Sequence, residues 1–348
     1  MRSAISVLVV DDSAFMRKVV TQILIEGGLV VLGQARDGHE AIEKAASLRP
    51  DVITLDVEMP GMDGITALKE ITEKLHIPVV MLSSLTQAGA VTTLRCLEQG
   101  AVDFVAKPSG AISLNIREVG AEIVAKVRTA AQVKVVPATI SAAVKPLAAS
   151  RGLRRSLVLI GSSTGGPRAL QAVIPALPGN LMIPIVVVQH MPPAFTATLA
   201  ERLNQSSALS VKEAAPGDRL TPGQVLVAPG GHHLEFDGSG RASINDGPVV
   251  HGVRPAIDVT LASLVRTYGP SMVGVLLTGM GSDGALGLKA IRDSGGFTIA
   301  ESESTCVVYG MPKAAVDLGA ATVSVPLGQI AAAITDAVSE PSSGLRAS

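Results

Sequence analysis

Apolar runs alternate with segments of helical period through the first 130 residues of the chain. Five short unbroken apolar runs are each followed by a segment in which apolar residues recur every three or four positions. The runs are residues 5–10, 29–33, 52–55, 79–82 and 102–105, and the helical segments are 15–25, 38–48, 65–71, 90–97 and 114–130. This alternation predicts a doubly wound α/β domain with a five-stranded parallel sheet.

The pattern breaks between residues 129 and 155, where Ala, Val, Ser, Thr and Pro replace the periodic segments and a basic cluster follows. Such a stretch predicts an interdomain linker, partly extended because of its prolines. We therefore expect a first domain at residues 1–128, a linker at 129–155 and a second domain at 156–340. The linker is long enough for the first domain to rest against the second and to swing away. The tail beyond Ser339 is expected to be disordered.

The second half resumes the alternation with apolar strands predicted at residues 156–160, 183–188 and 273–277. The first and third run directly into glycine-rich turns, and helices are predicted from residue 168 and over residues 285–292. Strand, turn and helix in this order predict an α/β domain with a mostly parallel sheet.

The composition narrows the functional classes. Of the 348 residues, 47% are hydrophobic and 17% charged, which is typical of a globular protein with two domains of ordinary size. A formal net charge of -1 and an aromatic content of 2% disfavour nucleic acid as a partner. No apolar stretch approaches the roughly 20 residues of a membrane span, and Cys96 and Cys306 form no CxxC pair. We expect a cytoplasmic protein that is not inserted in a membrane.

Polar residues stand where the predicted strands of the first domain end. Asp11 and Asp12 follow the first strand, Asp56 the third, Ser83 the fourth and Lys107 the fifth. Parallel strands end at one edge of a sheet, so these side chains should converge. Three carboxylates repel each other unless a divalent cation lies among them, and oxygen ligands suit Mg²⁺.

These residues resemble the receiver domain of two-component response regulators. The pattern consists of Asp11-Asp12, Asp56 within the segment from Leu55 to Gly64, Ser83, Phe104 and Lys107-Pro108. The resemblance implies that Asp56 takes a phosphoryl group from a histidine kinase while Asp11, Asp12 and Asp56 hold Mg²⁺. It implies further that Ser83 and Lys107 contact the phosphoryl oxygens.

The turn after the strand at 156–160 carries a candidate nucleophile. Gly161-Ser162-Ser163-Thr164-Gly165 matches G-x-S-x-G, a sharp turn that exposes one hydroxyl, here that of Ser163. A phosphate-binding loop is disfavoured because Pro167 stands where such a loop needs Lys. A purely structural turn that caps the next helix fits the motif alone equally well.

Two other strand ends supply partners for Ser163. His190 follows the strand at 183–188, at the edge where a general base is needed, and Asp283 precedes the helix at 285–292, where the helix dipole favours its ionised form. The backbone N–H of Met280 is the predicted oxyanion donor. The remaining histidines fit less well, because His251 lies in a Gly/Pro-rich loop and the neighbours His232 and His233 point apart.

The glycine-rich turn that contains Asp283 has a competing interpretation. Residues 279–284 form a literal G-x-G-x-x-G between strand and helix, and Glu301 follows where a ribose-binding acid belongs. Against a dinucleotide site, Asp283 would compete with the pyrophosphate for the same helix end.

Taken together, the second half resembles the catalytic domain of the chemotaxis protein-glutamate methylesterases (CheB). The resemblance rests on residues 161–166, 189–193, 227–230, 277–284 and 310–312, with Ser at positions 162 and 282 where the family usually has Ala and Asn. It implies a hydrolase, activated by phosphorylation, that demethylates glutamate methyl esters and deamidates glutamines on chemoreceptors. Ser163, His190 and Asp283 would form its triad, with no cofactor in the catalytic domain and a monomeric chain. A transcriptional output and a nicotinamide-binding output remain the alternatives.

Overall fold

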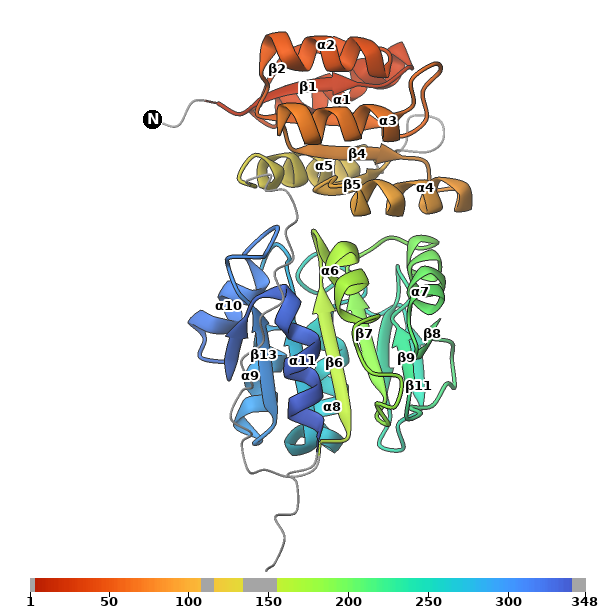
Figure 1. Ribbon diagram of the computed structural model, residues 1–348, viewed down its shortest axis with the longest axis vertical. Helices are drawn as coiled ribbons and strands as arrows, with labels where there is room; N and C mark the ends of the chain where they lie inside the picture. The colour runs from red at the N-terminus through yellow and green to blue at the C-terminus, as the bar shows by residue number, and fades with distance from the viewer. Residues whose placement is uncertain (1–3, 108–115, 134–154, 340–348) are drawn as a thin grey trace, which may run out of the picture. The chain divides into compact units, whose positions relative to one another are not determined.

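The computed structural model describes residues 4–107, 116–133 and 155–339 (Figure 1). The chain divides into two compact units, residues 1–139 and 140–348. Most of the predicted linker and the tail beyond Ser339 lie outside the described residues, so the expected domain bounds of 128, 155 and 340 stay predictions.

The first unit contains a five-stranded parallel sheet in the order β2-β1-β3-β4-β5. The strands are β1 (Ser6–Val10), β2 (Val30–Ala35), β3 (Val52–Asp56), β4 (Val79–Ser83) and β5 (Asp103–Ala106). The helices are α1 (Ala14–Glu26), α2 (Gly38–Leu48), α3 (Gly64–Glu70) with its continuation η1 (Ile71–Leu75), α4 (Gln87–Glu98) and α5 (Ile116–Ala130). This confirms the predicted doubly wound fold.

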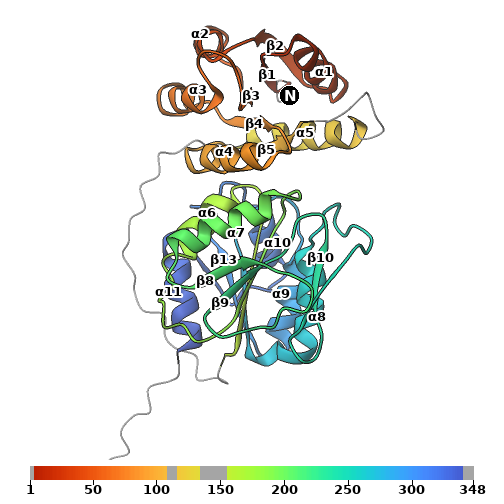
Figure 2. The ribbon, with the colours of Figure 1, turned by 90° about the vertical axis from the view of Figure 1, so that its right-hand side faces the viewer.

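The burial of this sheet explains its unbroken apolar runs. Helices α1 and α5 cover one face, and α2, α3 and α4 cover the other, as Figure 2 shows. Every residue of β3 and β4 is therefore buried, because a parallel strand with helices on both faces has no solvent side.

The second unit contains a seven-stranded parallel sheet in the order β14-β13-β12-β6-β7-β9-β8. The strands are β6 (Leu157–Ser162), β7 (Ile185–Gln189), β8 (Ser210–Glu213), β9 (Gln224–Val227), β12 (Met272–Leu276), β13 (Phe297–Glu301) and β14 (Val323–Val325). A separate antiparallel pair, β10 (His233–Phe236) and β11 (Ala242–Asn245), packs against the helix α8. The predicted parallel α/β domain is confirmed.

Helices lie on both faces of this second sheet. They are α6 (Gly166–Val173), α7 (Phe195–Ser206), α8 (Ile257–Tyr268), η2 (Gly269–Ser271), α9 (Ala285–Asp293), α10 (Met311–Asp317) and α11 (Leu327–Val338). In Figure 2, α11 lies on one side of the sheet and α8 and α9 on the other. Among the described residues, no helix is long and apolar enough to cross a lipid bilayer.

The strand order decides where the polar turns of this unit meet. Strand β6 is central, with β7 on one side and β12 on the other, and all three run parallel. The turn with Ser163, the residue His190 and the turn with Asp283 follow these three strands. They therefore lie at one edge of the sheet, as the sequence predicted.

Candidate active site

Ser163 is the first residue after β6, and its backbone is tied to the neighbouring strand end. Its N–H donates to the carbonyl of Thr278 at 3.0 Å. Gly279 lies so close that a Cβ there would come within 2.7 Å of the Ser163 Cβ. The Ser163 side chain is partly exposed. The adjacent Ser162 is fully buried, and its hydroxyl donates to Gln189 Oε1 at 2.6 Å. Of the two hydroxyls, Ser163 is thus the one that a substrate can reach.

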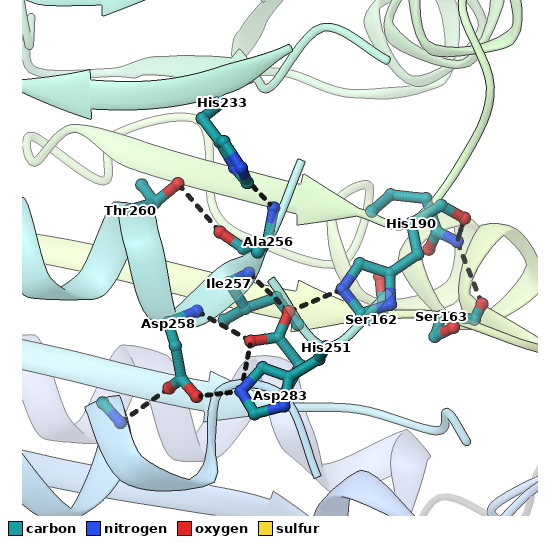
Figure 3. A network of polar contacts seen from close by, with 12 residues as sticks. Ser162, Ser163, His190, His233, His251, Ala256, Ile257, Asp258, Thr260 and Asp283 are labelled. Atoms are coloured by element: carbon teal, nitrogen blue, oxygen red, sulfur yellow. Dashed lines mark hydrogen bonds and ion pairs between the residues drawn. The ribbon is translucent and has the colours of Figure 1, made fainter. Parts of the chain in front are cut away.

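His190 occupies the corresponding position on the neighbouring strand. Ser162 and Gln189 are register partners in β6 and β7, and the His190 N–H donates to the Ser162 carbonyl at 3.0 Å. Residues 163 and 190 are thus the next pair along two strands that lie about 4.8 Å apart. Figure 3 shows the His190 ring directed toward Asp283, and its Nε2 lies 2.8 Å from Asp283 Oδ2.

This contact fixes which ring nitrogen is available. An ionised carboxylate only accepts, so Nε2 carries the proton in the neutral ring. Among the described residues no group is bonded to Nδ1. Nδ1 is therefore the nitrogen left to accept a proton.

Asp283 is buried, with 2% of its surface exposed, and it is held by backbone donors from another helix. Oδ2 accepts from the Ile257 N–H at 2.6 Å, and Oδ1 accepts from the Asp258 N–H at 3.0 Å. These N–H groups belong to the first turn of α8, which has no side-chain cap of its own. Burial by itself raises the pKa of Asp283. The hydrogen bond from His190, the positive charge of the protonated His190 ring and these two donors nevertheless bring the pKa of Asp283 below the ordinary value. Asp283 precedes α9, as predicted, but the donors that stabilise its charge belong to α8.

His251, which the sequence analysis ranked low, lies beside this carboxylate. Its Nε2 is 3.1 Å from Asp258 Oδ2 and 3.9 Å from Asp283 Oδ1 (Figure 3). Asp258 in turn accepts from the Gly287 N–H of α9 at 2.8 Å, and burial together with the charge of Asp283 raises the pKa of Asp258. No motif surrounds His251 in the sequence, so only the fold places it here.

The ligand atoms of His251, Asp258 and Asp283 lie within 4.8 Å of one another, close enough to surround a metal ion. Two helix N-termini, those of α8 and α9, direct their N–H groups at the carboxylates. Such donors favour anions and disfavour a cation. The arrangement therefore fits a charged carboxylate with hydrogen-bond donors better than a metal centre.

The dinucleotide interpretation of the turn at 279–284 fits the structure poorly. Glu301 ends β13 with 0% of its surface exposed, and its Oε2 accepts from the Thr278 N–H at 2.9 Å. A carboxylate committed beneath the turn does not reach a ribose at the surface. Nor do the other histidines gather around a metal: His233 bonds to the Pro248 carbonyl and the Ala256 N–H, whereas His232 bonds to Asp246.

Met280, predicted to supply an oxyanion donor, stands in the same turn with 49% of its surface exposed. Both backbone groups of its neighbour Gly279 are engaged, since its N–H donates to the Val308 carbonyl and its carbonyl accepts from Gly310 and Met311. The role of the Met280 N–H stays a prediction.

The first unit gathers its predicted acids as expected. Oxygens of Asp11, Asp12 and Asp56 lie within 4.8 Å of one another. Lys107 Nζ lies 2.8 Å from Asp11 Oδ2 and 2.7 Å from Asp56 Oδ2. Burial, with a further contribution from the charge of Asp11, raises the pKa of Asp56 to about 6 despite Lys107. Three hard oxygen donors whose charges are only partly balanced fit a bound Mg²⁺.

Ser83 and Phe104, also predicted as site residues of this unit, make contacts with helices α4 and α5, respectively. The Ser83 hydroxyl is buried and accepts from Thr93 Oγ1 of α4 at 2.6 Å, while its proton is within reach of the Ser84 carbonyl at 3.2 Å and the Gly89 carbonyl at 3.4 Å. Phe104 is buried in β5, with Lys126 Nζ 5.1 Å from its ring centroid. A contact of Ser83 with a phosphoryl group would require its hydroxyl to donate to that group and not to the Ser84 or Gly89 carbonyl.

Both units of the chain are similar to known protein families. The sequence model described as "CheB methylesterase" matches residues 158–334, and that described as "Response regulator receiver domain" matches residues 7–117. A relative from Symbiobacterium thermophilum, named protein-glutamate methylesterase/protein-glutamine glutaminase, is 53% identical over 97% of this chain and 98% of its own. A protein of the same name from Archaeoglobus fulgidus is 51% identical over 93% and 95% of the two chains. Among solved structures, the Thermotoga maritima CheB methylesterase catalytic domain is 44% identical, with a TM-score of 0.50 over 52% of this chain and 98% of that one.

Proposed function

The chain belongs to the CheB methylesterase family and carries a response regulator receiver domain, and from that premise we propose a phosphorylation-activated protein-glutamate methylesterase and protein-glutamine glutaminase acting on methyl-accepting chemoreceptors. The observation that carries the proposal is the His190–Asp283 contact of 2.8 Å, at a strand end adjacent to that of Ser163. Acyl transfer needs a hydroxyl, a base and a carboxylate that orients the base.

In the proposed mechanism, Ser163 Oγ attacks the ester or amide carbonyl of the substrate. His190 Nδ1 accepts the Ser163 proton and Nε2 keeps its hydrogen bond to Asp283, whose negative charge stabilises the imidazolium. The Met280 N–H stabilises the oxyanion. The proton on His190 then passes to the leaving group, which departs as methanol or ammonia, and water hydrolyses the acyl enzyme with His190 as base.

The receiver half is proposed to take its phosphoryl group from a histidine kinase. Asp11, Asp12 and Asp56 would hold Mg²⁺, which when bound neutralises charge on the phosphoryl oxygens. Asp56 accepts the phosphoryl group, and Lys107 and Ser83 contact its oxygens. Phosphorylation shifts the population from an arrangement in which the receiver restrains the catalytic domain to one in which it does not. We place this activity in the cytoplasm and expect a monomer with domains at 1–128 and 156–340.

Methanol release from methylated receptor, measured with and without a small phosphodonor, tests the proposal. Ser163→Ala should lower turnover by at least about a thousandfold while phosphorylation of Asp56 continues. Ser162→Ala is the matched control, since it removes the neighbouring hydroxyl, and it should retain activity. Near-normal turnover of Ser163→Ala with loss of activity in Ser162→Ala would move the nucleophile to Ser162, and the absence of any methanol release from the wild type would refute the function.

A further inference from the structure

Gln189 is a buried polar residue for which the mechanism above has no use. It ends β7 directly before His190, and 2% of its surface is exposed. Its side-chain amide makes three hydrogen bonds. Oε1 accepts from Ser162 Oγ at 2.6 Å, and Nε2 donates to the Ser163 carbonyl at 2.9 Å and to the His190 carbonyl at 3.0 Å. One side chain thus joins the backbone of the nucleophile to that of the base.

The orientation of this amide is determined by its partners. The two carbonyls can only accept, so the nitrogen must face them and the oxygen must face the Ser162 hydroxyl. Both N–H groups and one lone pair are then used by a side chain that has 2% of its surface exposed. Because buried polar groups left unpaired cost free energy, the turn and the amide favour this single arrangement.

The glycine at position 166 is explained by the same contact. Its φ is not in the left-handed region, so other residues could adopt its backbone conformation. A Cβ at Gly166 would, however, lie 2.0 Å from Gln189 Oε1 and 2.9 Å from the Ser162 Cβ. The second glycine of the Gly165-Gly166 pair thus makes room for the Gln189 side chain.

We propose that Gln189 is a positioning residue that sets the distance between the Ser163 hydroxyl and His190 Nδ1. This inference rests on the proposed function, because it assigns to Gln189 an effect on the Ser163–His190 pair. The nucleophile turn is held on its other side by the bond from Ser163 N–H to the Thr278 carbonyl. The Gln189 amide supplies the side-chain link to the His190 strand, and a reacting pair misplaced by about 1 Å can lose about a hundredfold in rate.

Gln189→Glu is the sharpest variant, because it preserves size and keeps an acceptor for Ser162 while removing both donors. The ionised carboxylate would face the carbonyls of Ser163 and His190 and repel them. Protonation restores one donor, so activity relative to the wild type should rise as the pH falls from about 8 to about 5.5. Gln189→Met removes the donors without adding charge, and its ratio to the wild type should not change with pH.

The experiment measures kcat and KM for methanol release, referred to active sites titrated with a fluorophosphonate so that only folded molecules count. Both Gln189 variants should lose tenfold to a hundredfold in kcat at about pH 8. KM should change by less than about twofold, because the amide is not placed to touch the substrate. Gln171→Glu is the matched control: Gln171 is on α6 and bonds to the Ser206 hydroxyl near the surface, so the same chemical change should have little effect.

Three results would overturn the inference. The first is a kcat for both Gln189 variants within about twofold of the wild type. The second is a loss that appears in KM alone, and the third is a Gln189→Glu defect that is the same at every pH. Ser163→Ala, whose turnover is referred to total protein because it has no serine to titrate, separates the two claims, since retained activity there contradicts the proposed function whatever the Gln189 variants do.

Discussion

Asp56 and Asp283 are the same residue type in the same kind of place, yet their pKa values shift in opposite directions. Each stands at the end of a parallel strand or in the turn after it, each has 2% of its surface exposed, and each contacts a basic side chain, Lys107 or His190. Burial raises the pKa of Asp56 to about 6. Burial acts on Asp283 as well, but its hydrogen-bond donors hold the pKa below the ordinary value.

The difference lies in the partners of each carboxylate. Asp283 receives two backbone N–H groups of α8 in addition to the His190 ring. Asp56 shares Lys107 with Asp11 and receives one backbone N–H, that of Glu58, at 3.3 Å. The Asp283 site is complete within the protein, whereas the Asp56 site gains from an added cation. A permanent anion is what the proposed triad needs, and an acid that lacks balancing charge is what the proposed Mg²⁺-dependent phosphoryl acceptor needs.

Loss of the negative charge of Asp283 should have the largest effect on kcat. Asp283→Asn places an amide opposite His190 Nε2 and removes the charge that stabilises the imidazolium, so kcat should fall by about four orders of magnitude. The measurement is methanol release under saturating substrate. Phosphorylation of Asp56 by a small phosphodonor is the internal control and should be unchanged; a loss of less than about tenfold would contradict the role of Asp283.

Removal of Mg²⁺ tests the proposed site at Asp56. Excess EDTA should abolish stimulation of methanol release by a phosphodonor and leave basal release intact, because the proposed triad is formed by protein groups alone. Asp56→Asn should give the same result in the presence of Mg²⁺. If stimulation survives in either case, phosphorylation of Asp56 is not the activating event.

The free energy of unfolding should depend on pH differently for Asp56 and Asp283, because their pKa values are shifted in opposite directions. Because the pKa of Asp56 is raised to about 6, its ionisation opposes folding increasingly from about pH 4 to about pH 6 and fully above that, so in metal-free buffer at pH 7.5 Asp56→Asn should raise the free energy of unfolding by about 1–3 kcal/mol. This gain should shrink as the pH falls below about 6 and vanish below about pH 4, where the carboxyl is protonated in both the folded and the unfolded state. The contribution of Asp283 is present above about pH 4 and is lost as the pH falls through its lowered pKa, so Asp283→Asn should destabilise at neutral pH and less in acid. Urea unfolding at each pH measures both differences, and equal signs for the two variants at pH 7.5 would refute the contrast.

The smallest expected effect concerns His251. Asp283 is already held by Ile257 and Asp258, and His251 Nε2 is 3.9 Å from its Oδ1. His251→Ala should therefore lower kcat by only about two- to fivefold. A loss as large as that of Asp283→Asn would mean that His251, and not the α8 backbone, controls the Asp283 carboxylate. His232→Ala, on a histidine that bonds to Asp246 instead, is the matched control.

The receiver half was the easier half to predict, for a physical reason. Its apolar strands and its polar strand ends follow one another in regular order, so Asp11, Asp56 and Lys107 could be placed at one edge without coordinates. The position of the Ser83 hydroxyl could not be predicted, because it depends on hydrogen bonds with Thr93, Ser84 and Gly89 that form only once α4 packs beside β4.

In the second half, the order of residues is enough to predict that a hydroxyl, an imidazole and a carboxylate each follow an apolar strand, because strands and glycine turns are local patterns. It is the folded chain that makes β7, β6 and β12 neighbours, directs the N–H groups of α8 at Asp283 and lets Gln189 span the two strand ends. Those relations join residues far apart in the chain. They depend on which strand pairs with which and on how buried groups satisfy their hydrogen bonds, and neither leaves a short-range pattern in the sequence.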